Sequence, residues 1–462
     1  MHTKRIHPYV YIIMSFLSIV LIGTVLLVMP FASNSGKSFG FVDSFFMATS
    51  AVCVTGLSVM PNGLGADMSI YGKIVMCILI EIGGLSIITI AVFFFTIIGA
   101  KIGISNRYII REALNQNSVK GIIKLVRNIV LTSLTIQLIA TLINWYPFYT
   151  YLQAHGNNNF FAAFGLSLFH SISAFNNAGF DITYSNMSLV EFSSTANVIP
   201  QASMITINIT TMLLILLGGI GFVVIQDLLK HHRWRYLSLH TKITLITTLI
   251  LIVVGTLLIK VTSDLGFLES AFTAFTARTA GFTTWDMSTM EIMYPATYIV
   301  VLTLMMVGAS PCSTGGGIKT TTIAIIMISV FYFAIGKKPK AFQRKISNQQ
   351  IFKAFVLMNV AIIIVVICAF LIMIIQPELP VAKVIFEVIS AFSTTGLTLG
   401  ITTSLNAGSK FIICFLMLFG RIGPLTIIGL LNKNWMNQKH ENIDYIEESV
   451  IIGWKRVLLL SD

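Results

Sequence analysis

The chain alternates long apolar runs with short polar segments. Runs without Asp, Glu, Lys or Arg include residues 8–36, 128–180, 192–226, 243–259, 292–318 and 354–377. A helix needs about 20 apolar residues to cross the hydrocarbon core of a bilayer, and several of these runs are long enough. The pattern therefore predicts a helical protein that crosses a membrane several times.

Lysine and arginine mark one side of that membrane. Of the 30 Lys and Arg residues, 22 fall in five segments: 1–8, 100–127, 228–242, 336–353 and 432–462. Positively charged loops stay in the cytoplasm, so these segments and both termini are placed there. Between consecutive basic segments the chain must leave the cytoplasm and return. This predicts four excursions and a multi-pass protein of the cell membrane.

Each excursion has the same three parts. An outgoing helix is expected at about 9–30, 128–150, 243–260 and 354–376, and a returning helix at about 72–99, 202–227, 294–335 and 409–431. A shorter segment of helical character lies between the two. The corresponding units are 1–105, 106–228, 229–340 and 341–431, followed by a cytoplasmic tail, 432–462.

The short segments end alike. They are FFMATSAVCVTGL, LFHSISAFNNAGF, ESAFTAFTARTAGF and EVISAFSTTGL, and each closes on a glycine followed by Leu or Phe. About 12 residues cannot span a bilayer, and irregular backbone at membrane depth survives only when buried in protein or facing water. Glycine lets the backbone turn its carbonyls toward an axis, and four such strands can replace a cation's hydration shell. A single copy would be read as an ordinary turn, but four in register predict an all-α fold of helix–pore-loop–helix units around one pseudo-fourfold pore.

Composition excludes other classes of protein. Only 10% of the residues are charged and the mean hydropathy is +0.86, whereas a soluble domain carries about 25% charged residues. The net charge of +12 follows the membrane asymmetry, so nucleic acid is not expected as a partner. The five cysteines lie in apolar segments without CxxC spacing, and no HExxH or GxSxG motif indicates an enzyme.

The four glycine motifs carry a family resemblance. VTGL, NAGF, TAGF and TTGL, in this order, resemble the filters of the Ktr/Trk/HKT superfamily of K⁺ transporters, and the chain is more similar to the bacterial KtrB and KtrD membrane subunits than to TrkH. The resemblance runs from about Tyr9 to Leu431 and implies K⁺ uptake with K⁺ held at filter carbonyls only, no covalent cofactor, and Na⁺ left open as an activating ion. The implied filter residues are Val54, Thr55, Gly56, Asn177, Ala178, Gly179, Thr279, Ala280, Gly281, Thr394, Thr395 and Gly396. In plant relatives a serine in place of the first filter glycine accompanies Na⁺ selectivity, so Gly56 favours K⁺.

The third returning helix is too long for one span. Its 42 residues are interrupted by GASPCSTGGGIKTTT, which differs from a phosphate loop because Ile318, not glycine, precedes Lys319. From the residues alone, the stretch is either a kinked helix or a flexible polar loop. The resemblance implies an intramembrane gate loop below the filter, with residues Gly308, Ala309, Ser310, Pro311, Cys312, Ser313, Thr314, Gly315, Gly316 and Gly317.

Several charged residues lie in apolar surroundings. Arg421 stands in the middle of the fourth returning helix, where an arginine is costly and indicates function. The resemblance implies an electrostatic gate at Arg421, and the alternative is a structural pair, for example with Glu81. Arg278 is expected to point behind the third filter and brace it through carbonyls or a carboxylate. Lys319 either reaches the cytoplasmic surface or binds loop carbonyls.

Acids and partners complete the expectation. The outer segments hold ten acids beside five bases, which either attract cations to a vestibule or simply follow the topology rule.

The resemblance implies a homodimer docked on a cytoplasmic KtrA/KtrC-type ring that binds nucleotide, with the tail 441–462 as a candidate contact. The main alternative is a secondary cation transporter with broken helices, which predicts inverted halves and a chain of intramembrane acids.

Overall fold

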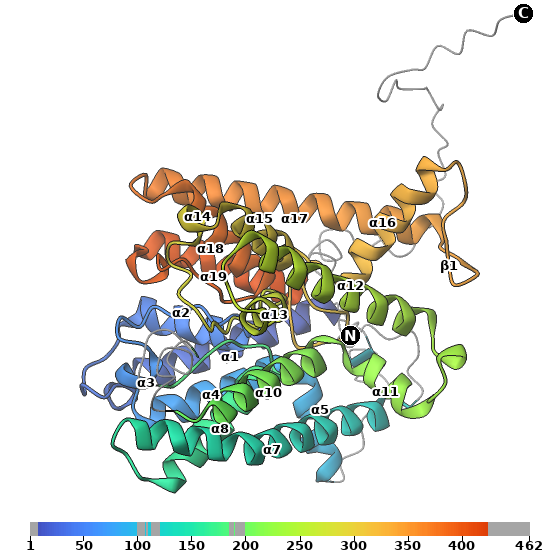
Figure 1. Ribbon diagram of the computed structural model, residues 1–462. Helices are drawn as coiled ribbons and strands as arrows, with labels where there is room; N and C mark the ends of the chain where they lie inside the picture. The colour runs from blue at the N-terminus through green and yellow to red at the C-terminus, as the bar shows by residue number, and fades with distance from the viewer. Residues whose placement is uncertain are drawn as a thin grey trace, which may run out of the picture.

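Four long apolar helices form where the outgoing helices are predicted. In the computed structural model, which describes residues 8–98, 107, 110, 111, 121–183, 189 and 199–423, they are α1 (Pro8–Val28), α7 (Ile122–Ala154), α12 (Leu239–Thr262) and α17 (Asn348–Ile375). Each contains an apolar stretch long enough to cross a membrane. Serine caps begin two of them: Ser238 Oγ accepts from the Thr241 N–H, and Ser347 Oγ accepts from the Gln350 N–H. These helices run broadly across the view in Figure 1.

The returning helices are broken in more places than the sequence predicts. The pieces are α4 (Ile70–Leu85), α5 (Ile87–Ile97), α10 (Gln201–Gly219), α11 (Phe222–Lys230), α15 (Pro295–Met306), α16 (Thr320–Ala334) and α19 (Ala407–Ile422). Only the third break was expected. The first two occur at Ser86 and Gly221, whose φ angles are +71° and +96° and so leave the helical region. The predicted end of the fourth returning helix, 424–431, lies outside the described residues, as does the tail.

A short helix sits between each pair of long ones. These helices are α2 (Phe41–Val52), α8 (Phe160–Phe175), α13 (Phe267–Thr276) and α18 (Val381–Ser393), with 12, 16, 10 and 13 residues. Their length is too small for a membrane span, as predicted. The boundaries of the four units fall partly outside the described residues and stay a prediction.

The packing of helices repeats along the chain and closes on itself. Each short helix packs against the long helix before it, in the pairs α1–α2, α7–α8, α12–α13 and α17–α18, and also against the returning helix of its own unit. Each returning helix packs in turn against the short helix of the next unit, in the pairs α4–α8, α10–α13, α15–α18 and α19–α2. The last pair joins the fourth unit to the first, so the chain surrounds a centre. The all-helical fold predicted from the sequence is confirmed.

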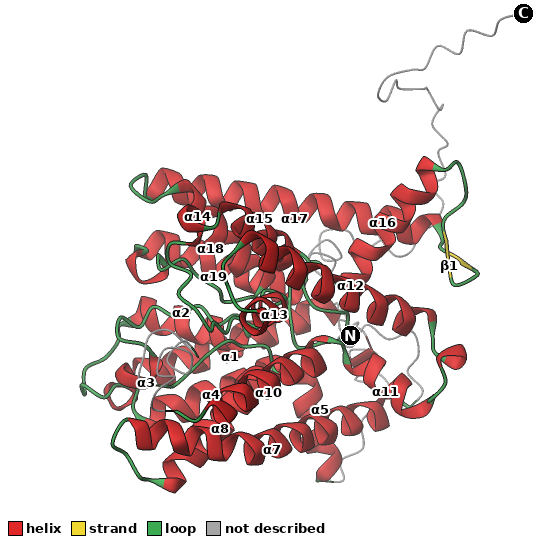
Figure 2. Ribbon diagram, in the orientation of Figure 1, coloured by secondary structure: helices red, strands yellow, loops and turns green. Residues whose placement is uncertain are grey.

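The remaining elements lie at the two ends of the long helices. They are η1 (Pro30–Ala32), α3 (Leu64–Asp67), η2 (Trp234–Tyr236), α14 (Met290–Met293), β1 (Lys340–Ala341), β2 (Arg344–Lys345) and η3 (Thr402–Ser404). The strands β1 and β2 form an antiparallel hairpin between α16 and α17, drawn in yellow in Figure 2. The hairpin lies at the opposite end of the molecule from α3 (Figure 1).

Candidate functional site

The four predicted filter segments share one backbone path. In each segment the glycine has a positive φ, and so does the residue two positions before it. The φ angles are +56° and +96° for Val54 and Gly56, +58° and +67° for Asn177 and Gly179, +76° and +80° for Thr279 and Gly281, and +51° and +87° for Thr394 and Gly396. Non-glycine residues rarely adopt positive φ. Four matched pairs therefore indicate one local structure built four times.

The same segments meet in a ring. A Cβ built on each glycine would lie under 3.0 Å from a carbonyl oxygen of the next segment: Gly56 from that of Ala178, Gly179 from Ala280, Gly281 from Thr395, and Gly396 from Thr55. Each carbonyl belongs to the residue just before a filter glycine, and the fourth segment contacts the first. The ring is therefore closed, and it has no room for a side chain at any of the four positions.

The ends of the short helices hold the segments in place. The N–H groups of Thr55, Ala178 and Thr395 donate to carbonyls five residues earlier, at 2.8 to 2.9 Å. Hydroxyl groups add a second attachment: Ser173 Oγ donates to the Phe180 carbonyl and Thr276 Oγ1 to the Phe282 carbonyl, at 2.8 and 2.7 Å. Each of these helix ends carries a partial negative charge toward the ring.

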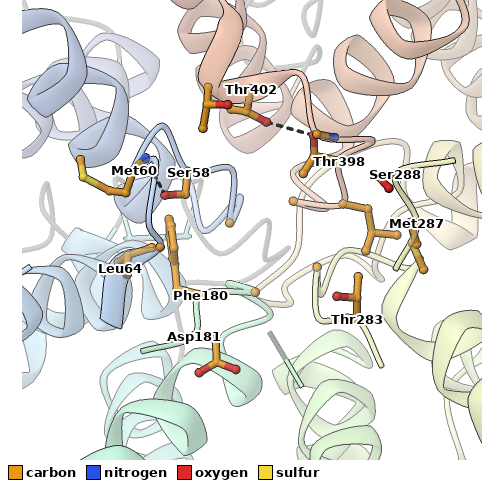
Figure 3. A pocket seen from close by; sticks show the side chains of 18 of the residues that line it. Ser58, Met60, Leu64, Phe180, Asp181, Thr283, Met287, Ser288, Thr398 and Thr402 are labelled. Atoms are coloured by element: carbon orange, nitrogen blue, oxygen red, sulfur yellow. Dashed lines mark hydrogen bonds between the residues drawn. The ribbon is translucent and has the colours of Figure 1, made fainter. Parts of the chain in front are cut away.

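A polar cavity of about 300 Å³ opens on one side of the ring. All four filter glycines line it, together with hydroxyl side chains and the carboxylates of Asp181 and Asp286. Figure 3 shows side chains from each of the four units around this cavity: Ser58, Asp181, Thr283 and Thr398. Residues from each segment after its glycine line the cavity, whereas Thr279 and Thr394, two positions before their glycines, contact the loop 308–317 instead.

A buried carboxylate, Glu387, lies behind the cavity wall. In the sequence analysis it was included only among the ten acids of the outer segments. Glu387 of α18 is 1% exposed and accepts hydrogen bonds from Thr398 Oγ1 at 2.8 Å and Thr402 Oγ1 at 2.5 Å. Both threonines line the cavity. The signal in the sequence was an acid in a short helix whose flanking residues, from Val384 to Ile389, are apolar. The contacts make Glu387 the anchor of the loop after the fourth filter segment.

The interrupted stretch of the third returning helix lies against the other side of the ring. The Gly316 N–H donates to Thr394 Oγ1 at 2.9 Å, and a Cβ on Gly315 would overlap Thr279 Oγ1. The loop is also tied to the break in α10: the N–H groups of Ser310 and Thr314 donate to the carbonyls of Gly219 and Gly218 at 3.0 and 3.2 Å. Residues 308–317 thus form a loop directly beneath the filter segments, where the gate loop is predicted.

Two positively charged side chains, Arg421 and Lys319, donate hydrogen bonds to carbonyls of this loop. Arg421 donates to the Thr314 carbonyl and also to the carbonyls of Gly83 and Gly84, at the break in the first returning helix. Lys319 donates from Nζ to the Gly315 carbonyl at 2.6 Å, which resolves the two alternatives left open for it. Arg421 therefore joins three units at one point.

Glu81 is not the partner of Arg421. Its Oε2 accepts from Gln137 Nε2 at 2.9 Å and from Asn176 Nδ2 at 2.7 Å. Asn176 caps the second short helix, directly before the second filter segment. Glu81 thus links the first returning helix to the second filter segment through amides rather than through an ion pair.

The prediction that Arg278 braces the third filter segment through carbonyls or a carboxylate is wrong. The side chain is 7% exposed, and its Nε is buried without a hydrogen-bond partner. Across the part of the chain that the structure describes, Arg278 donates to no filter carbonyl and pairs with no carboxylate. Its position in the third segment leaves the guanidinium packed rather than bonded.

A second set of glycines escaped the sequence analysis. Gly83, Gly218 and Gly420 of the returning helices each approach the carbonyl of Val52, Phe175 or Phe392, so closely that a Cβ would lie under 3.0 Å away. Each of these carbonyls belongs to the residue four positions before a filter glycine. The signal is a repeated tetrapeptide at the helix breaks: GGLS from 83, GGIG from 218, GASP from 308 and GRIG from 420.

This alignment shows how Arg421 differs from the matching residues of the other three units. The position after the first glycine is Gly84, Gly219 and Ala309 in the first three units, and Arg421 in the fourth. In three units this residue is small, and in the fourth it is a long cation that binds a carbonyl of the loop.

Gly420 is expected to be required for folding. Alanine at position 420 would force its Cβ into the Phe392 carbonyl, and overpacking of this kind costs about 1–3 kcal/mol. The matched control is Gly408→Ala in the same helix, where the nearest atoms lie at 3.5 and 3.6 Å and alanine favours the helix by up to about 1 kcal/mol. Thermal unfolding in detergent should show a lower melting temperature for Gly420→Ala only. Equal melting temperatures for the two variants would contradict the close approach.

Known proteins match this chain in sequence and in structure over most of its length. The family described as TrkH, cation transport protein, matches residues 2–439. The Ktr system potassium uptake protein B of Bacillus subtilis strain 168 is 37% identical, with 96% of each chain covered. The potassium/sodium uptake protein NtpJ of Enterococcus hirae is 34% identical, covering 97% of this chain and 98% of that protein. In structure, the chain is similar to the potassium transporter TrkH from Vibrio parahaemolyticus with a TM-score of 0.69 and 17% identity, covering 94% of this chain and 87% of that one. The structural match establishes the fold alone.

Proposed function

The chain belongs to the TrkH family of cation transport proteins, and from this premise we propose that it is the K⁺-translocating subunit of a Ktr-type uptake system in the cell membrane. The family is one of membrane cation transporters rather than enzymes. Relatives named as potassium uptake proteins support K⁺ as the ion. The observation that carries the proposal is the closed ring of main-chain carbonyls and glycines.

Ion selection occurs at that ring. A K⁺ ion entering the ring exchanges its water for carbonyl oxygens, which needs several oxygens facing one axis at fixed spacing. The glycines permit this spacing because no side chain separates one segment from the next carbonyl. Asp181 and Asp286 at the cavity raise the local concentration of cations at the entrance.

The loop beneath the ring is the gate. Its backbone occupies the space below Thr279 and Thr394, and Arg421 and Lys319 hold two consecutive loop carbonyls. Both side chains place positive charge on the ion path, which repels a passing cation as well as fixing the loop. Opening requires these hydrogen bonds to break together.

Energy for opening comes from a partner. We place a homodimer of this chain on a cytoplasmic nucleotide-binding ring of the KtrA/KtrC type, with Na⁺ as a candidate activating ion. Several relatives are named as parts of a Ktr system, which supports a multicomponent assembly. The tail 441–462 is the candidate contact with the ring.

Growth of a K⁺-uptake-deficient bacterium on low K⁺ tests the function. The chain, expressed with a ring subunit, should restore growth, and Rb⁺ uptake measured with and without Na⁺ shows whether Na⁺ activates. The variant Gly281→Ser, whose side chain would overlap the Thr395 carbonyl, should lose much of its preference for K⁺ over Na⁺. No restored growth, despite normal amounts of protein in the membrane, would contradict K⁺ uptake. An unchanged ion preference in the variant would contradict the filter.

A further inference from the structure

Cationic and aromatic side chains gather in the connection between α11 and α12. Lys230, Arg233 and Arg235 are exposed there. Trp234 and Tyr236, in η2, are 48% and 63% exposed although their rings are largely apolar. This connection leads straight into α12, because Arg235 lies four residues before Leu239, where α12 begins.

The hairpin between α16 and α17 carries a second group of cations. They are Lys337, Lys338, Lys340, Arg344 and Lys345, and all are exposed. Segment 335–347 contains no acid. Lys337 lies three residues after the end of α16, and Lys345 lies three residues before the start of α17. The cations are therefore held at the ends of membrane helices.

Ring contacts join the two groups into one surface. Phe342, at the hairpin turn, packs edge-on against Trp234 with ring centroids 6.3 Å apart. Lys242 Nζ lies 6.0 Å from the Trp234 ring and 5.9 Å from the Phe342 ring. We call the surface the basic patch. It consists of Lys230, Arg233, Trp234, Arg235, Lys337, Lys338, Lys340, Phe342, Arg344 and Lys345.

Asp227, the one acid near the patch in the part of the chain that the structure describes, already has hydrogen-bond partners. Asp227 accepts from the Ser238 N–H at 2.9 Å, from Thr241 Oγ1 at 2.6 Å and from His231 Nδ1 at 2.9 Å. Burial alone would raise the pKa of Asp227, but hydrogen bonds from Thr241, Ser238 and His231 outweigh it and lower the pKa below its ordinary value. Asp227 therefore stays ionised and fixes the α11–α12 connection, and no acid among the described residues forms an ion pair with the eight cations of the patch.

We propose that the basic patch binds the phosphate groups of anionic phospholipids in the membrane leaflet on that side. Clusters of four to eight Lys and Arg beside a membrane helix attract anionic headgroups, and Trp and Tyr rings favour the same interfacial depth. Lysine and arginine supply the donors that phosphate oxygens accept. A water-soluble protein partner explains the charges, but it does not explain why five of the eight cations lie within four residues of the ends of α12, α16 and α17, beside exposed rings.

Lipid retention by the full chain tests this inference, and its readout does not depend on transport. The protein is reconstituted in nanodiscs of equal parts phosphatidylcholine and phosphatidylglycerol, released into detergent, and the lipids that remain bound are counted by native mass spectrometry. The variant Lys340→Gln/Arg344→Gln should lose enrichment in phosphatidylglycerol by about tenfold or more, the change expected when two cations leave an anionic surface. Added salt should weaken the wild-type enrichment.

The matched control is Lys124→Gln/Arg127→Gln. It removes one lysine and one arginine that are exposed near the start of α7, outside the basic patch. This control should retain phosphatidylglycerol as the wild type does, and both variants should melt at the wild-type temperature in phosphatidylcholine. Equal enrichment in the patch variant and the wild type would overturn the proposal, and so would an equal loss in the control. Loss of a cytosolic protein partner with unchanged lipid retention would also overturn it and make the patch a protein-docking surface.

Discussion

Alanine in place of Gly396 is expected to abolish most K⁺ uptake. Gly396 has a φ of +87°, and a Cβ there would overlap the carbonyl oxygen of Thr55. That carbonyl belongs to the closed ring, so the alanine must displace either a carbonyl oxygen of the ring or the whole fourth segment. A loss of only 1.4 kcal/mol of interaction with the ion lowers the rate about tenfold. We therefore expect Rb⁺ uptake to fall at least about tenfold while the protein still reaches the membrane.

Gly400→Ala separates backbone strain from the close contact. Gly400 has the same φ of +87°, and no atom lies within 4 Å of its Cβ position. Both alanines bear the same cost of left-handed backbone, about 1–2 kcal/mol, but only Gly396→Ala meets the neighbouring segment. Uptake by Gly400→Ala should stay near that of the wild type. Equal losses in the two variants would mean that backbone strain, rather than the ring, explains the glycine.

Alanine in place of Arg421 is expected to open the pore without a partner. The change removes hydrogen bonds to the carbonyls of Thr314, Gly83 and Gly84, and charge-assisted bonds each contribute about 1.5–3 kcal/mol. In proteoliposomes that contain this chain alone, K⁺ flux should rise at least about tenfold over the wild type, since that rise needs only 1.4 kcal/mol. The measurement is the initial rate of Rb⁺ entry at equal protein content.

Arg421→Lys distinguishes a tether from an electrostatic barrier. Lysine keeps the positive charge, but a single ammonium cannot span three carbonyls as the planar guanidinium does. A tether predicts that the lysine variant leaks like the alanine variant, whereas a barrier predicts that it stays closed. Wild-type flux in both variants would remove Arg421 from the gate.

Much of the architecture was predictable because it repeats. Four apolar pairs, four short helices and four glycines at matching places predicted the helices and the residues that meet in the ring. The third break was predictable from its length and its polar composition. The breaks at Ser86 and Gly221 were not, because GGLS and GGIG lie in continuous apolar sequence and contain no proline. Their cause is tertiary: Gly83 and Gly218 approach the carbonyls of Val52 and Phe175.

Long polar side chains were harder to place than small ones. Arg421 could have reached Glu81, but the structure pairs it with carbonyls and leaves Glu81 to two amides. Arg278 was expected to have partners because a buried charge usually does, yet its side chain makes no hydrogen bond to a described residue. Which partner such a side chain binds depends on distances across helix interfaces. The spacing of residues along the sequence does not give these distances.

The single arginine among three small residues has a consequence for how the protein switches. In a channel assembled from four identical subunits, every gating element occurs four times. A mutation therefore changes all four copies, and opening requires all four to move together. Here the four quarters are covalently joined and have been free to diverge, and the loop and its arginine each occur once. With the gate that we propose, one local event is sufficient to turn flow on or off, and natural selection can adjust that event while leaving the other three quarters as rigid scaffold.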